Sequence, residues 1–292
     1  MMNSKPERVE VRKTHKLFIG GAFPRSESGR TYEALDTYGE FLANMAMASR
    51  KDARDAVIAA RTAFASWSKA TAYNRGQVLY RIAEVMEGRK DQFVVDIEQC
   101  EGVSNKKAHK QVEAAIDRMV WYAGWADKYA QVLGNTNPVA GPFFNFSIPE
   151  PTGVVAAVAP DSPSLLGLVS VIAPIVMTGN SVIAIASYKN PIPAISLSEC
   201  LATSDVVGGN INILTGDPAE IMPWLASHAD VNALDLTGVT DHQLLTQLET
   251  EAAGTVKRVR TAPAGPDFYA TPTLSRVRAF TEIKTVWHPM GV

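Results

Sequence analysis

The chain has 292 residues, of which 46% are hydrophobic and 20% charged, and its net charge is -2. This composition supports one large folded domain or two smaller ones and excludes a mainly disordered chain. Because there is no basic excess, we expect neither a nucleic-acid partner nor an anionic membrane surface as partner. No apolar run reaches the roughly 18–20 residues of a membrane span, and residues 1–16 lack the apolar core of a secretion signal. With only two cysteines in the chain, these features predict a cytoplasmic location.

The first part of the chain is predicted to be mainly helical. Residues 1–16 are typical of a solvated tail, and 17–19 followed by two glycines predict a short strand and turn. Two extended segments are expected next, over 31–35 and 41–47. Apolar residues then recur at helical spacing, which predicts helices around 53–67, 78–86 and 112–122.

The second part predicts a β-hairpin and then a parallel sheet. Residues 135–142 are rich in Asn, Pro and Gly and precede a mostly apolar stretch over 143–148, which is typical of a hairpin. From residue 152, near-continuous apolar runs alternate with helical segments, so we expect a doubly wound α/β fold whose parallel sheet is covered on both faces. Its strands are expected over 154–159, 182–185, 211–214, 231–236 and 255–259, and 280–287 alternates as a final strand.

The residues that could carry chemistry give weak signals. Cys100 lies between Glu98 and Glu101, whose charges raise the pKa of a thiol, and Cys200 lies in an apolar stretch. We therefore favour structural roles for both cysteines over a nucleophilic role. The five histidines have no carboxylates at metal-ligand spacing, and standard phosphate-binding glycine loops do not occur, so no metal site is expected. The aromatic cluster over 143–146 fits a ligand-stacking surface or, as we favour, a hairpin face that packs on another subunit.

Several segments resemble the aldehyde dehydrogenase superfamily, in the order in which that superfamily carries them. The matching segments include Leu17-Phe18-Ile19-Gly20-Gly21, Tyr122-Ala123-Gly124-Trp125-Ala126-Asp127-Lys128, Glu150-Pro151-Thr152-Gly153-Val154-Val155, Asn212-Ile213-Leu214-Thr215-Gly216 and Phe280-Thr281-Glu282-Ile283-Lys284-Thr285-Val286. The resemblance implies a Rossmann-like sheet with an oligomerisation hairpin. The superfamily's catalytic domain needs on the order of 200 residues before the last strand, and only 266–279 are left for it, so we expect this domain to be missing.

The same resemblance implies a division of the chain into domains. After the tail over 1–16, residues 17–131 and 151–262 would form an NAD-binding-like α/β domain. Residues 132–150 and 274–292 would form a discontinuous oligomerisation β-element. Residues 263–273 would be a linker in the place of the catalytic domain.

The chain departs from the superfamily at the motifs that carry its chemistry. In the superfamily, an asparagine amide donates to the oxyanion of the thiohemiacetal that forms during catalysis. In this chain Ser162 takes the position of that asparagine, and the carboxylate of the neighbouring Asp161 would repel an oxyanion. The two charges that hold the adenosine ribose are missing from 185–188, and the general-base motif falls on 262–265, which has no carboxylate. We therefore expect no catalytic residue and no bound cofactor, with retained NAD binding as the less favoured alternative. The positions of a vestigial cofactor site are Pro160, Ser187, Gly216 and Gly238.

Three further segments resemble the non-catalytic C-terminal half of the tandem-domain branch, the sixteenth aldehyde dehydrogenase family. They are Ala159-Pro160-Asp161, Ser204-Asp205-Val206-Val207-Gly208-Gly209 and Trp287-His288-Pro289-Met290-Gly291. The resemblance implies a pseudoenzyme that assembles with itself, with a catalytic aldehyde dehydrogenase, or with both, in a structural or regulatory role. One alternative is an NAD(P)-dependent oxidoreductase acting on an aldehyde, directly or within a hetero-oligomer. A sensor that binds NAD without chemistry is the other.

Overall fold

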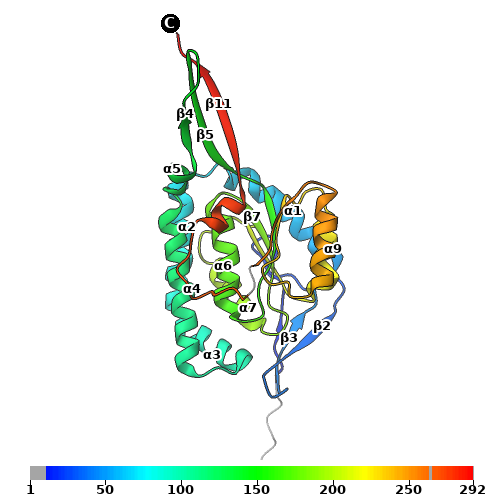
Figure 1. The fold of residues 1–292 in the computed structure, drawn as a ribbon. Helices are drawn as coiled ribbons and strands as arrows, with labels where there is room; N and C mark the ends of the chain where they lie inside the picture. Colours follow the sequence, from blue (N-terminus) through cyan, green and yellow to red (C-terminus); the bar gives the residue numbers. More distant parts are fainter. Residues whose placement is uncertain (1–10, 263–264, 292) are drawn as a thin grey trace, which may run out of the picture.

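The computed structural model describes residues 11–262 and 265–291, and its centre is a five-stranded sheet (Figure 1). Every neighbouring pair in this sheet is parallel, and the strand order is β10-β9-β6-β7-β8. The strands are β6 (Val154–Val158), β7 (Ser181–Ile185), β8 (Ile211–Leu214), β9 (Ala233–Asp235) and β10 (Arg258–Arg260). The prediction of a doubly wound parallel sheet is confirmed.

Helices cover both faces of the sheet because its strands are apolar on both sides. In β6, Val155 and Ala157 pack into one core, whereas Val154, Ala156 and Val158 pack into the other. The first core holds α2 (Ala72–Gly88), α3 (Lys90–Glu101), α4 (Asn105–Trp125), α6 (Ser164–Met177) and α7 (Ile192–Leu201). The second holds α1 (Arg50–Trp67), α8 (Pro218–Ser227) and α9 (His242–Ala253).

Two smaller sheets flank this body. The first contains β1 (Thr14–His15), β2 (Thr31–Leu35) and β3 (Phe41–Ala46) in the order β1-β3-β2. The second, which we call the ribbon, contains β4 (Asn135–Asn137), β5 (Phe143–Pro151) and β11 (Thr281–Pro289) in the order β11-β5-β4. The short helices α5 (Tyr129–Leu133) and α10 (Ser275–Ala279) lead into the ribbon, which stands out from the body (Figure 1).

Helix α6 is buried along its whole length, so its carbonyl end needs partners from other elements. The indole Nε1 of Trp67 donates to the carbonyl of Val176 at 2.9 Å, and Nε of Arg75 donates to that of Met177 at 2.9 Å. The carbonyl of Ile175 accepts from the hydroxyl of Thr178 at 2.7 Å. These contacts fix α6, and therefore its opposite end, against the sheet.

The structure differs from the sequence-based expectations at some element boundaries. Residues assigned to the tail include Thr14–His15, which pair in parallel with β3. Residues 17–19 make single bridges, such as that of Phe18 to Ile213, and no continuous strand. The last strand of the central sheet begins at Arg258 because Val256 has a φ of 54° and cannot lie in an extended segment. Throughout residues 11–262 and 265–291, every helix is too short or too polar to cross a lipid bilayer.

Candidate functional site: a cleft at the switch point of the sheet

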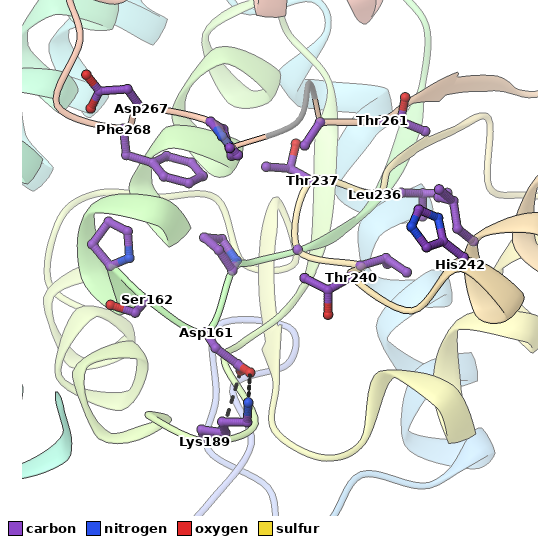
Figure 2. A pocket seen from close by; sticks show the side chains of 18 of the residues that line it. Asp161, Ser162, Lys189, Leu236, Thr237, Thr240, His242, Thr261, Asp267 and Phe268 are labelled. Atoms are coloured by element: carbon purple, nitrogen blue, oxygen red, sulfur yellow. Dashed lines mark hydrogen bonds and ion pairs between the residues drawn. The ribbon is translucent and has the colours of Figure 1, made fainter. Parts of the chain in front are cut away.

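A cleft of about 700 Å³ opens at the carboxyl end of the central sheet (Figure 2). From β6 the chain continues to β7 and β8 on one side of the sheet, and it returns to β9 and β10 on the other. The loops after β6 and β9 therefore diverge, which creates the crevice where open α/β sheets bind ligands. Residues 160–163, 236–240 and 265–269 form most of its wall.

Of the four positions predicted for a vestigial cofactor site, Pro160 and Gly238 line this cleft. A Cβ atom on Gly238 would lie 2.2 Å from the carbonyl oxygen of Ala159, so only glycine fits there. The amide of Gly238 also donates to the carbonyl of Val158 at 2.9 Å. The glycine thus allows the loop after β9 to pack directly on the end of β6.

The other two predicted positions, Ser187 and Gly216, lie outside the residues that line the cleft. Ser187 is buried, and its hydroxyl donates to Oδ1 of Asp161 at 3.0 Å and accepts from the amide of Asn190 at 2.8 Å. Gly216 has a φ of +138°, and a Cβ there would lie 3.1 Å from the amide nitrogen of Ala48. The contacts of both residues hold loops together.

The amino end of α6 points toward this region, and protein side chains already occupy its amides. The carboxylate of Glu101 accepts from the amide of Ser164 at 2.8 Å and from the hydroxyl of Ser162 at 2.7 Å. The side-chain oxygen of Gln111 accepts from the amide of Leu165 at 3.1 Å. A helix amino end normally attracts anions through free amides and a positive dipole. Here the carboxylate of Glu101 occupies the position that a bound anion would take at the amino end of α6.

The other charges around the cleft are also unfavourable for a phosphate group. Asp241 caps the amino end of α9 and accepts from the amide of Gln243 at 2.8 Å. Lys189, a basic residue of the cleft wall, has its Nζ 3.2 Å from Oδ2 of Asp161 (Figure 2). Asp267 adds a further carboxylate to the wall. In the described part of the cleft wall, Asp161 and Asp267 are thus carboxylates, and Lys189 is paired with Asp161.

Both thiols lie outside the cleft and are poorly suited to nucleophilic attack. Burial raises the pKa of Cys100 to about 12, and the charges of Asp96 and Glu101 add to this effect. Burial raises the pKa of Cys200 to about 11. Both groups are protonated at neutral pH, whereas the nucleophile is the thiolate. Cys100 lines a separate cavity of about 610 Å³ beside Tyr32 and Tyr188, whose ring centroids are 4.8 Å apart.

Arg118, which is buried, and Arg276, which is partly buried, hold the segment that lines one side of the cleft, and the sequence pattern singles out neither of them. Arg118 donates to the carbonyls of Phe268 at 2.6 Å and Ala270 at 3.0 Å. Arg276 forms an ion pair at 2.9 Å with Asp235, which is fully buried at the end of β9. The sequence signal for the ion pair is Asp235 itself, an acidic residue in an otherwise apolar strand. These contacts hold Phe268, Ala270 and Arg276, which lie between β10 and the ribbon in sequence, against the body.

The ribbon carries exposed apolar side chains on both of its faces. Opposed pairs along β5 and β11 include Val286 with Phe146 and Trp287 with Asn145, so alternate residues point to opposite faces. Trp287 is 58% exposed and belongs to one face, and Phe144 is 46% exposed and belongs to the other. Exposed apolar side chains gathered on one element are typical of an interaction surface.

Comparison with known proteins identifies the family. The family model for the aldehyde dehydrogenase family matches residues 23–267. The chain is 31% identical over 254 residues to the putative aldehyde dehydrogenase DhaS of Bacillus subtilis, covering 84% of this chain and 50% of that protein. It is 32% identical over 270 residues to retinal dehydrogenase 2 of Gallus gallus, covering 89% of this chain and 50% of that protein.

Cytosolic 10-formyltetrahydrofolate dehydrogenase of Pongo abelii is 30% identical over 239 residues, which cover 79% of this chain and 26% of that protein. Among solved structures, HpcC from Thermus thermophilus matches with a TM-score of 0.81 and 29% identity, covering 85% of this chain and 48% of that chain. The chain thus spans about half, or less, of the length of these relatives. It belongs to the aldehyde dehydrogenase family.

Proposed function

We propose that this chain is a non-catalytic aldehyde-dehydrogenase-like subunit that assembles through the ribbon. Its partner is a second copy, a full-length catalytic aldehyde dehydrogenase, or both, and its role is structural or regulatory. The observation that carries the proposal is the ribbon itself, with apolar side chains exposed on both faces and an unpaired edge along β11. Unpaired edges and exposed apolar faces favour association.

The non-catalytic part of the proposal rests on the thiols and on the connection between β10 and β11. Neither cysteine lines the switch-point cleft, and burial raises the pKa of both. The chain passes from Arg260 to Thr281 through the short helix α10, whereas an independent domain needs at least about 50 residues. We propose that residues 263–273 take the place of the catalytic domain, between the NAD-binding-like domain (17–131 and 151–262) and the oligomerisation element (132–150 and 274–292).

We further propose that the chain functions without a bound cofactor. A solved structural neighbour, betaine aldehyde dehydrogenase from Staphylococcus aureus, is a complex with NAD+. In this chain, however, Glu101 and Asp241 cap the two helices at the cleft, and Asp161 neutralises Lys189. Calorimetric titration with NAD should therefore give no binding heat, and saturable binding would contradict this part of the proposal.

The resemblance to the non-catalytic half of the tandem-domain branch, and a cytoplasmic location, complete the proposal. Native mass spectrometry of the purified chain, alone and mixed with a catalytic aldehyde dehydrogenase of the same organism, tests it. We expect an oligomer in at least one sample. Trp287→Ser, which removes an exposed aromatic ring, should weaken it, and Tyr38→Ser, on an exposed turn far from the ribbon in sequence, serves as the matched control. A stable monomer in both samples would refute the proposal.

A further inference from the structure

A cavity of about 290 Å³ lies at one end of the small sheet β1-β3-β2 (Figure 1). The parallel strands β1 and β3 end there at His15 and Ala46, and the antiparallel strand β2 begins there at Thr31. The loop before β2, with Arg25 and Gly29, forms the rest of the wall. The described residues that line this cavity are all different from those that line the switch-point cleft, so the two are separate sites.

The wall of this cavity is cationic. Its described residues include Lys16, Arg25 and Arg30, and none of them is a carboxylate. His15 also lines the cavity and is uncharged at neutral pH, because burial lowers its pKa to about 4. The charge contrasts with the net charge of -2 of the whole chain, since residues 1–30 carry seven Lys or Arg and only three Glu. A wall of this kind concentrates positive potential and attracts anions.

Two of these three cations have no counter-charge. Arg30 forms an ion pair with Glu220 of α8, with 2.9 Å between Nη2 and Oε2. In contrast, the side chains of Lys16 and Arg25 form neither an ion pair nor a hydrogen bond with any residue of 11–262 or 265–291. Like charges that line one small cavity repel each other, and an anion bound between them would relieve this repulsion.

The carboxylates behind the wall already have partners. Asp52 is buried and accepts from the hydroxyl of Ser26 at 2.7 Å and from the amide of Glu27 at 3.0 Å. The side chain of Glu27 is in turn ion-paired with Lys51, with 3.1 Å between Oε2 and Nζ. These contacts hold the loop before β2 in place and leave the two unpaired cations to a ligand.

The donors around the cavity suit a phosphate group. Guanidinium forks and the point charge of a lysine ammonium are the groups with which proteins bind phosphate. The hydroxyls of Thr14 and Thr31 also line the wall and can donate to phosphate oxygens. The volume lies near the lower end of the roughly 300–1,000 Å³ of small-molecule sites, which leaves room for a small organic group beside the phosphate.

We propose that this cavity binds a small phosphate monoester, whose phosphate group lies between Lys16 and Arg25. The site goes beyond the proposed assembling function, because it includes neither the ribbon nor the switch-point cleft. It therefore stands or falls independently of whether the chain is an oligomer.

Calorimetric titration of the full chain at constant ionic strength tests the ligand class. The probes are glycerol 3-phosphate, inorganic phosphate and, as the uncharged control, glycerol, each at millimolar concentration. We expect saturable binding of both anions, with tighter binding of the ester, and no binding of glycerol. No saturable heat from glycerol 3-phosphate overturns the proposal. Inorganic phosphate that binds at least as tightly as the ester overturns the assignment to an ester.

Arg25→Gln tests the cationic wall. It removes one of the two unpaired charges and should weaken the binding of glycerol 3-phosphate at least about 10-fold, since hydrogen bonds to charged groups are the strong ones. Arg81→Gln is the matched control, because Arg81 is an exposed arginine of α2 and lies outside the wall. It should bind the ester as the wild type does.

Gly29 allows a second test that separates charge from shape. A Cβ atom at Gly29 would meet no atom of the described residues within 4 Å, its chain neighbours aside, and its φ of +67° is one that Asn and Asp tolerate. Gly29→Asp adds a carboxylate to the wall and should weaken binding of the ester at least about 10-fold, whereas Gly29→Asn should retain it. Equal affinities of these two variants, or unweakened binding by Arg25→Gln, overturns the proposed site.

Discussion

Replacing Asp235 with asparagine removes a buried carboxylate at the junction of the central sheet and α10. Asp235 is fully buried, and its Oδ2 lies 2.9 Å from Nη1 of Arg276. Its Oδ1 accepts from the amide of Thr237 at 3.0 Å. Arg118 and Arg260 lie near enough that the charge of Arg276 lowers the pKa of both, although burial is the larger cause. The buried carboxylate of Asp235 therefore contacts Arg276 directly, and its charge also acts on Arg260, whose pKa it raises.

The expected cost is large because asparagine keeps the shape and loses the charge. Breaking a buried pair by removing one partner costs about 3–5 kcal/mol, since it leaves an uncompensated buried charge. For a chain of this length, that loss corresponds to a fall in Tm of about 5–8 °C, because the entropy of unfolding grows with the number of residues. The amide at this position would also direct a donor toward the donor of Arg276.

Urea and thermal unfolding, followed by circular dichroism, would measure the effect. The double variant Asp235→Asn with Arg276→Met removes both partners and should recover at least about 1 kcal/mol relative to the sum of the single variants. Strictly additive single and double variants would show that the pair is not coupled. A loss of less than about 0.5 kcal/mol in Asp235→Asn would refute its assigned role in anchoring α10, since surface substitutions commonly give that little.

Three further predictions concern thiol reactivity, packing and pH. Cys100 and Cys200, with pKa values raised by burial to about 12 and about 11, should react with iodoacetamide at pH 8 only after unfolding; rapid native labelling would contradict this. Gly238→Ala places a Cβ 2.2 Å from the carbonyl oxygen of Ala159 and should cost about 1–3 kcal/mol in urea unfolding; an unchanged midpoint would refute the packing argument. Burial lowers the pKa of His15 to about 4. The unfolded chain therefore takes up this proton first as pH falls, and about 3 kcal/mol should be lost between pH 6.5 and 4 relative to a His15→Asn variant. Parallel pH–stability curves for the two proteins would exclude this effect.

The sequence predicts the central sheet well because its strands are apolar on both faces and are bounded by turn residues. Residues 154–158 illustrate this, since Gly153 precedes them and Pro160 follows. Gly238 could be placed in the cleft because a strand–turn–helix pattern brings its loop to the same edge as Pro160. Parallel strands share one carboxyl edge, so loops far apart in sequence meet there.

The long-range polar contacts could not be predicted from local pattern. Arg118 donates to the backbone carbonyl of Phe268, which is 150 residues away in sequence. Because every residue has a backbone carbonyl, the sequence does not indicate which one accepts this hydrogen bond. In the sequence Glu101 stands out only as a negative neighbour of Cys100, whereas in the fold it caps α6. That contact depends on how α3 packs against the loop after β6, which periodicity does not determine.

The most direct test of the account is the formation of reduced cofactor by the purified chain incubated with aldehydes and NAD(P). With both thiols buried and protonated and the cleft capped by carboxylates, we predict no rate above that of the buffer. Steady turnover by the chain alone, abolished by Cys100→Ala or Cys200→Ala, would contradict the claim that this member of the family is a non-catalytic subunit.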